Sequence, residues 1–185
     1  MPTLPNVLPP PGDDYPVEPP AGPSDSPWFG TGFTLDKVEY VMEWKLLDSK
    51  TIKIYVSITD RAWIGIGWKE PGPAMAGMNQ LGGADMFVAT FSGGKIDRLQ
   101  DMHGNPDGAN GTPLKDDSND VIDFGGAQSA DFSEFWFTRK LDTGDDDDVK
   151  ITSGKRDFIV AFGNDNLFGL HSPNRRSTVR FDFNV

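Results

Sequence analysis

His171 is the residue in this chain best suited to chemistry. The protein has two histidines, and imidazole is the side chain most often recruited for metal ligation or proton transfer near neutral pH. His171 stands in a turn-rich loop after the apolar residues 158–162, and Phe168 and Leu170 place it at the edge of an apolar surface. A capping or hydrogen-bonding role is the alternative. His103 lies in a polar turn, and we interpret it as a solvated loop histidine.

Three methionines are candidates for a second metal ligand beside His171. Met75, Met78 and Met86 fall within twelve residues around a Gly-rich and Pro-rich loop. Methionine is often an adaptable filler of apolar cores, which is one interpretation of the group. A thioether is also a soft axial ligand, and opposite a histidine it makes a six-coordinate haem iron suited to electron transfer. Methionine and His171 together therefore predict a haem site.

Composition excludes several other kinds of site. The net charge of −11 argues against nucleic acid as a partner, since a phosphate backbone is bound by clustered Lys and Arg. The absence of cysteine excludes iron–sulfur clusters, thiol nucleophiles and covalently attached haem of the c type. The chain contains no G-x-S-x-G, H-E-x-x-H or P-loop motif. We therefore expect no catalysis by the domain on its own.

Two acidic stretches deserve comparison with calcium loops. Residues 142–148 and 101–111 are rich in aspartate, but neither has the alternating ligand spacing and terminal glutamate of the helix–loop–helix calcium motif. We interpret both as solvated turns that could hold a weakly bound cation. A metal near Asp85, with loop carbonyls as further ligands, is a second form of this hypothesis.

The elements that would position these residues read as strands. Apolar residues alternate with polar ones in 38–46 and in 52–58, which is the two-residue period of half-buried strands. Residues 63–68, WIGIGW, form a third strand, in which two glycines allow close approach to the backbone. Further strands are expected near 85–91, 95–100, 121–124, 134–139, 157–162 and 178–183, and no segment has a sustained helical period. Short strands with Gly-rich turns predict an all-β antiparallel sandwich.

The N-terminal segment differs from the rest. Most of the 15 prolines lie in residues 1–27, which predicts an extended arm or linker over residues 1–33 before a sandwich domain over 34–185. The arm is either a flexible linker or a segment that lies on a partner subunit. No run of 18 apolar residues occurs, so we expect no transmembrane segment, and the start of the chain lacks the basic and apolar regions of a signal peptide.

The order of several short motifs resembles a known family. These motifs are W-I-G-I-G-W (63–68), a Met-containing loop, G-A-D (83–85), R-K-L-D-T-G-D (139–145), F-I-V-A-F-G (158–163) and H-S-P-N-R-R (171–176). Together they resemble the DOMON domain, the β-sandwich module of dopamine β-monooxygenase-like proteins and of the cytochrome domain of cellobiose dehydrogenase. The resemblance implies an immunoglobulin-like, extracytoplasmic sandwich, secreted or at the cell surface. It covers residues 34–185.

The resemblance also implies how a haem b would be held. In haem-binding members the iron lies between a Met before the G-A-D strand and a His after the A-F-G strand. Carried onto this chain, these positions are Met78, with Met75 in reserve, and His171. In the family pattern the Met stands close to G-A-D, whereas residues 79–82 separate Met78 from Gly83 here.

The same hypothesis assigns further cofactor-binding residues. Apolar side chains around a haem tune its potential by excluding water, and arginine suits haem propionates because of its planar fork. The expected pocket walls are Trp68, Met86, Phe87, Phe168 and Leu170. The expected propionate ligands are Arg175 and Arg176, for which ordinary surface charge is the alternative.

Two functions follow from these expectations. The first is a b-type haem-binding electron-transfer domain with Met/His axial ligation, whose partner is a redox protein or another subunit. The alternative is a haem-free binding or assembly module that acts as a structural subunit and contacts a glycan or a protein through the Met loop and the Pro-rich arm.

Overall fold

The strands of the protein form two facing layers. The computed structural model describes residues 27–70, 83–104 and 113–185. The strands are β1 (Phe29–Leu35), β2 (Val38–Leu46), β3 (Thr51–Ile58), β4 (Ile64–Trp68), β5 (Asp85–Ser92), β6 (Lys95–His103), β7 (Leu114–Lys115), β8 (Val121–Gln128), β9 (Ser133–Lys140), β10 (Gly154–Phe162) and β11 (Arg176–Phe183). A 3-10 turn, η1 (Pro173–Arg175), precedes β11. Within the described ranges no helix is long and apolar enough to cross a membrane.

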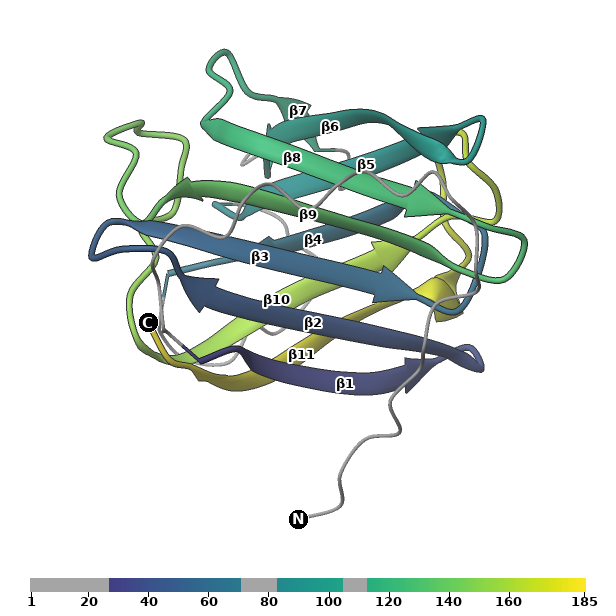
Figure 1. Ribbon diagram of the computed structural model, residues 1–185, viewed down its shortest axis with the longest axis horizontal. Helices are drawn as coiled ribbons and strands as arrows, with labels where there is room; N and C mark the ends of the chain where they lie inside the picture. Colours follow the sequence, from purple (N-terminus) through teal and green to yellow (C-terminus); the bar gives the residue numbers. More distant parts are fainter. Residues whose placement is uncertain (1–26, 71–82, 105–112) are drawn as a thin grey trace.

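All strand pairs are antiparallel, in the order β1-β2-β3-β9-β8-β6-β5-β4-β10-β11, and β7 pairs with β6. Strands β6 and β8 share one residue pair, Lys95 with Ala127, so the sheet bends there into two layers. In Figure 1 the layer β1-β2-β3-β9-β8 lies in front of the layer β6-β5-β4-β10-β11. The predicted antiparallel β-sandwich is confirmed.

The main core lies between the layers and follows the predicted alternation. On β2 and β3 the apolar residues of the two-residue period are buried, for example Tyr40 and Ile54 at 0% exposure. Aromatic rings join the layers: the centroids of Phe87 and Phe137 lie 4.3 Å apart. The ring of Trp44 on β2 packs 4.7 Å from that of Phe183 on β11, which joins the two layers near the free edges of the sheet at β1 and β11. Burying such side chains stabilises the fold by about 1.5–3 kcal/mol each.

The first strand begins earlier than the sequence indicates. Strand β1 starts at Phe29, so the expected boundary between arm and domain at residue 33 falls inside a strand. Gly30 and Gly32 leave positions on one face of β1 without side chains, which removes the period that would identify a strand. The arm up to residue 26 lies outside the described residues.

Candidate functional site

His171 lies in the loop that joins β10 to η1. Its ring centroid is 6.2 Å from that of Trp63, and Phe168 meets the same indole edge-on at 5.2 Å. The Nδ1 atom of His171 lies 3.3 Å from the carbonyl oxygen of Ser172. In the tautomer with hydrogen on Nδ1, this contact is a hydrogen bond and leaves Nε2 as the free lone pair. Ligating histidines commonly have this arrangement.

The loop that carries His171 is fastened to the sandwich at both ends. At its start, the Trp63 amide donates to the carbonyl of Asp165 at 2.9 Å, and the Gly163 amide donates to the carbonyl of Trp63 at 3.0 Å. At its end, Nη1 of Arg175 donates to Asp60 Oδ2 at 2.8 Å and to the Gly163 carbonyl at 2.6 Å. These contacts fix the backbone on both sides of His171.

Trp63 belongs to a second apolar cluster on the outer face of the β10-β4-β5-β6 layer. Its buried members are Trp63, Ala84, Met86, Val88 and Met102, and the partly buried Ile159 and Ala161 pack against them. Gly65 and Gly67 of β4 point to the same face: a Cβ on Gly65 would lie 3.4 Å from the Trp63 ring, and one on Gly67 would collide with Met86. The outer face beside His171 is therefore apolar and has few side chains along β4.

The residues predicted to line a haem pocket lie on opposite faces of the β10-β4-β5-β6 layer. Neighbouring strand residues point to opposite sides of a sheet, so Met86 lies in the outer cluster while Phe87 lies in the main core. Trp68 is also in the main core, where its ring packs 5.5 Å from that of Phe87. The expectation that Trp68, Met86 and Phe87 line one pocket is thus corrected. Met86 alone of these three shares a face with Trp63.

The remaining predicted wall residues lie on the His171 loop. Phe168 is 38% exposed and contacts Trp63, whereas Leu170 is 97% exposed and Leu167 is 79% exposed. Leu170 therefore forms no wall in this arrangement, because its side chain faces solvent. Three large apolar side chains are nevertheless presented beside His171.

The two predicted propionate ligands have different surroundings. Arg175 is engaged by the protein itself: besides its contact with Asp60, its Nε lies 3.3 Å from Asp36, and its guanidinium stacks over the Phe162 ring at 5.1 Å. The guanidinium of Arg175 is thus already paired with two carboxylates, and its role as a propionate ligand stays a prediction. Arg176 is exposed at the start of β11, opposite Ala161.

Met75 and Met78 lie outside the described residues. The strand ends that flank their loop are described, and they lie far from the His171 loop along β4. Phe158 pairs with Trp68 at one end of β4, and Phe162 pairs with Ile64 at the other. Four residue steps at about 3.3 Å separate these ends by about 13 Å. The loop that carries Met78 leaves from the Trp68 end, and the loop that carries His171 leaves from the Phe162 end.

A buried group of charges, which the sequence analysis missed, occupies the Trp68 end of the sandwich. The side chains of Arg139 and Asp85 are 0% exposed and form an ion pair, and Nη2 of Arg139 bonds Asp148 Oδ2 at 2.9 Å. Asp101 is 4% exposed on β6. The interpretation of Asp101 and Asp148 as solvated turn residues is wrong, and His103 is also in a strand, half-buried and 3.8 Å from Asp147.

Burial changes the acidity of this group. Desolvation raises the pKa of Asp85 to about 7, even though the Arg139 charge acts in the opposite direction. Desolvation likewise raises the pKa of Asp101 to about 8. One signal for the cluster was present in the sequence: Arg139 continues the inward-facing series of Phe135 and Phe137 on β9, and an arginine at an inward position requires buried partners.

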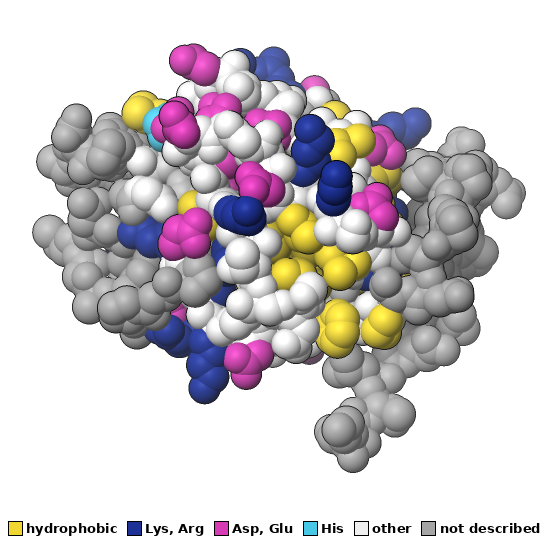
Figure 2. All heavy atoms as spheres, turned by 90° about the vertical axis from the view of Figure 1, so that its left-hand side faces the viewer, with side chains coloured by type: hydrophobic (Ala, Val, Ile, Leu, Met, Phe, Trp, Pro, Cys, Tyr) yellow, Lys and Arg dark blue, Asp and Glu magenta, His cyan; other side chains and the backbone are white. Residues whose placement is uncertain are grey.

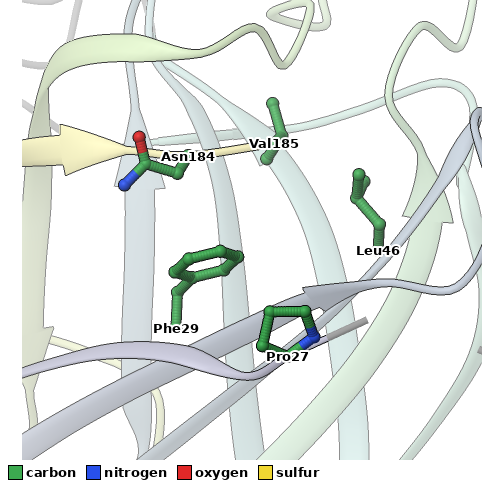
Figure 3. A pocket seen from close by; sticks show the side chains of 5 residues that line it. All are labelled: Pro27, Phe29, Leu46, Asn184 and Val185. Carbon is green, nitrogen blue, oxygen red and sulfur yellow. The ribbon is translucent and has the colours of Figure 1, made fainter. Parts of the chain in front are cut away.

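An apolar hollow of about 220 Å³ lies at the edge where β1 meets the C-terminal residues. Figure 3 shows its lining side chains, which are Pro27, Phe29, Leu46, Asn184 and Val185. It contains no titratable side chain and is smaller than most ligand pockets, which span about 300–1,000 Å³. We assign it no chemistry.

The fold and the sequence were compared with those of known proteins. The structure is similar to the cytochrome b domain of pyranose dehydrogenase from Coprinopsis cinerea, with a TM-score of 0.54, 12% sequence identity, and coverage of 79% of this chain and 76% of that chain. At this identity the similarity concerns the fold. No curated protein matches the chain. The family model of the DOMON domain matches residues 36–163, which include β2 to β10 and the Asp85 and Arg139 cluster, and the chain belongs to the DOMON domain family.

Proposed function

We propose that this DOMON domain binds haem b and transfers single electrons, with His171 as one axial ligand of the iron. The observation that carries the proposal is the setting of His171. Its imidazole packs against Trp63 at the border of the outer apolar face, and its Nδ1 lies beside a backbone carbonyl, so Nε2 is the nitrogen available to a metal. The structural similarity to a cytochrome b domain supports the same function.

The outer face has features that suit a flat apolar group. Gly65 and Gly67 of β4 have no side chains, so Trp63 and Met86 pack directly over their backbone, and with Phe168 they give this face an apolar surface. A bound haem would supply an iron that alternates between two oxidation states and so carries one electron. The chain's part is to hold His171, to exclude water with apolar side chains and to place Arg176 at an exposed edge for a propionate. No bond chemistry on a substrate is assigned to the domain.

The sixth ligand in this proposal is Met78, with Met75 in reserve. The ends of β4 are about 13 Å apart, so Met78 would reach His171 only if residues 71–82 ran back along the outer face. Twelve residues of extended chain can span about 40 Å, so the length is sufficient. Replacing Met78 with alanine should convert a low-spin haem into a high-spin one, while Met75→Ala should leave the spin state unchanged.

The experiment that tests the ligand assignment is a haemin titration of the purified protein. Wild type and His103→Ala should each take up one haemin per chain with a low-spin Soret spectrum, and His171→Ala should lose that spectrum. His103 is the matched control because it lies on β6 at the opposite end of β4 from the His171 loop. Equal effects of the two substitutions would refute the role of His171.

A second candidate function is a haem-free binding or assembly module that contacts another subunit or a glycan. Leu167, Phe168 and Leu170 favour it, since exposed apolar side chains gathered on one loop mark interaction surfaces. The Pro-rich arm could add to such a contact. Deleting residues 1–27 and measuring the mass of the assembly tests the arm, and an unchanged mass would count against it. Both functions are consistent with an extracytoplasmic location, which we propose on the basis of the family.

A further inference from the structure

Three carboxylates converge at the Trp68 end of the sandwich, away from His171. Asp85 begins β5, Asp101 lies near the end of β6, and Asp148 belongs to the segment between β9 and β10. One carboxylate oxygen from each of the three lies within 4.8 Å of the others. Figure 2 faces this end of the molecule, where acidic and basic side chains together surround a group of hydrophobic ones.

Each of these carboxylates has one oxygen already held by the protein. Oδ2 of Asp85 accepts from Arg139 and, at 3.1 Å, from the Val149 amide. Oδ2 of Asp148 accepts from Nη2 of Arg139 at 2.9 Å. Oδ2 of Asp101 accepts from the Asp120 amide at 3.0 Å. These bonds orient the carboxylates, as outer hydrogen bonds orient metal ligands.

The other oxygens of Asp85 and Asp101 are orphaned. Oδ1 of each is buried and has no hydrogen-bond partner among the residues that the structure describes, and the two residues are 1% and 4% exposed. Buried polar atoms without partners are rare and costly in native proteins. Two such atoms, one on Asp85 and one on Asp101, lie in the same cluster of three carboxylates and indicate a missing positive partner.

The net charge of the cluster also indicates a missing cation. Three carboxylates and the Arg139 guanidinium sum to −2 when all are ionised, which one divalent cation would neutralise. Arg156 is also near, but its guanidinium donates to the carbonyls of Lys150 and Thr152 and not to the carboxylates. The nearest arginines therefore leave the charge of the cluster uncompensated.

We propose that Asp85, Asp101 and Asp148 hold a calcium ion that fastens β5 and β6 to the segment after β9. The donors are oxygens only, which favours hard cations over zinc or copper. Calcium–oxygen distances of about 2.3–2.6 Å place ligands on opposite sides of the ion about 5 Å apart, whereas magnesium requires about 4 Å. One oxygen from each of the three carboxylates lies within 4.8 Å of the others, close enough for them to share one ion. Calcium accepts irregular sets of oxygen ligands, whereas magnesium demands near-ideal octahedral geometry, so we assign the site to calcium. Water would complete its coordination.

The test is a calcium titration of the full chain after treatment with EDTA. We expect one ion per chain by calorimetry, and a rise in Tm of about 5–10 °C at a calcium concentration of 100 Kd. Magnesium should give a smaller shift at the same concentration. No saturable binding and no shift in Tm at millimolar calcium would overturn the proposal.

Two substitutions locate the site. Asp101→Asn keeps the shape of the side chain and should weaken calcium binding at least tenfold. It should leave the Tm in EDTA equal to or above that of wild type, because Asp101 forms no ion pair with the described residues that the change would break. Asp145→Asn is the matched control, since Asp145 belongs to a second, more exposed acidic group with Asp116 and Asp147. A calcium response that survives Asp101→Asn, or that is lost in Asp145→Asn, would overturn the assignment. If Asp101→Asn fails to fold, Asp148→Asn provides the same comparison.

Discussion

Arg175 should hold the loop that carries His171 in place and stabilise the fold, whereas Arg176 should contribute little to either. Replacing Arg175 with glutamine removes its contacts with Asp60, Asp36 and the Gly163 carbonyl, and its stacking on Phe162. A hydrogen bond from a charged group contributes about 1.5–3 kcal/mol when buried. The contribution is smaller here, because the side chains of Asp60 and Asp36 are 31% and 29% exposed and can be hydrated.

We therefore assign about 1 kcal/mol to the carboxylate contacts together, about 1 kcal/mol to the carbonyl bond and about 0.5–1 kcal/mol to the stacking. Arg175→Gln should therefore lower the free energy of unfolding by about 2.5–3 kcal/mol. Arg176→Gln, at the next and exposed position, should change it by less than about 0.5 kcal/mol. Urea unfolding at neutral pH measures both values.

The same two variants separate the roles of the arginines toward haem. Arg175→Gln should weaken haemin binding because the loop around His171 loses its fastening, and the loss should accompany the loss of stability. If Arg176 binds a propionate, Arg176→Gln should weaken haemin binding with no change in stability. Equal stability of Arg175→Gln and wild type would refute the argument that Arg175 positions His171.

Three further predictions concern the rest of the molecule. Arg139→Met should cost about 3–5 kcal/mol of unfolding free energy, since it leaves the Asp85 carboxylate buried without its partner; a loss under 1 kcal/mol in urea unfolding would contradict this. Gly67→Ala should destabilise the fold by about 1–3 kcal/mol, because its Cβ would meet Met86 and the Asp85 carbonyl, whereas Gly32→Ala on β1 has ordinary contacts and should be nearly neutral. In EDTA, stability should fall as the pH rises. Because the pKa values of Asp85 and Asp101 are raised in the folded protein, the stability they contribute is fully present below pH 3.8, the pKa of an unperturbed aspartate. This stability is lost as the pH rises through their folded pKa values of about 7 and about 8. A rise in Tm between about pH 5 and 8 would contradict this.

The fold was predictable because its strands obey a simple period. Alternation along β2 and β3 identified both strands and their buried faces, for example Tyr40 and Ile54. Strand β1 was missed because Gly30 and Gly32 leave its outer positions without side chains. Alternation also implies that Met86 and Phe87 face opposite sides, and only the pairing of β4 with β5 and β10 shows which side faces the core.

The candidate sites were predictable in part. His171 could be singled out because histidine is rare in this chain and follows an apolar strand. The partners of Arg175 could not be found, since Asp36 and Asp60 are distant in sequence and meet it only in the folded molecule. The acidic cluster was hidden for a similar reason. Asp101 and Asp148 resemble solvated residues in the sequence and become buried only when β6 and the segment after β9 close over Arg139.

We propose that this DOMON domain holds a haem through His171. The most direct measurement is the visible spectrum of the purified protein, recorded oxidised and then reduced, before and after addition of haemin. We expect a Soret band that sharpens and shifts on reduction. A colourless protein that takes up no haemin would contradict it.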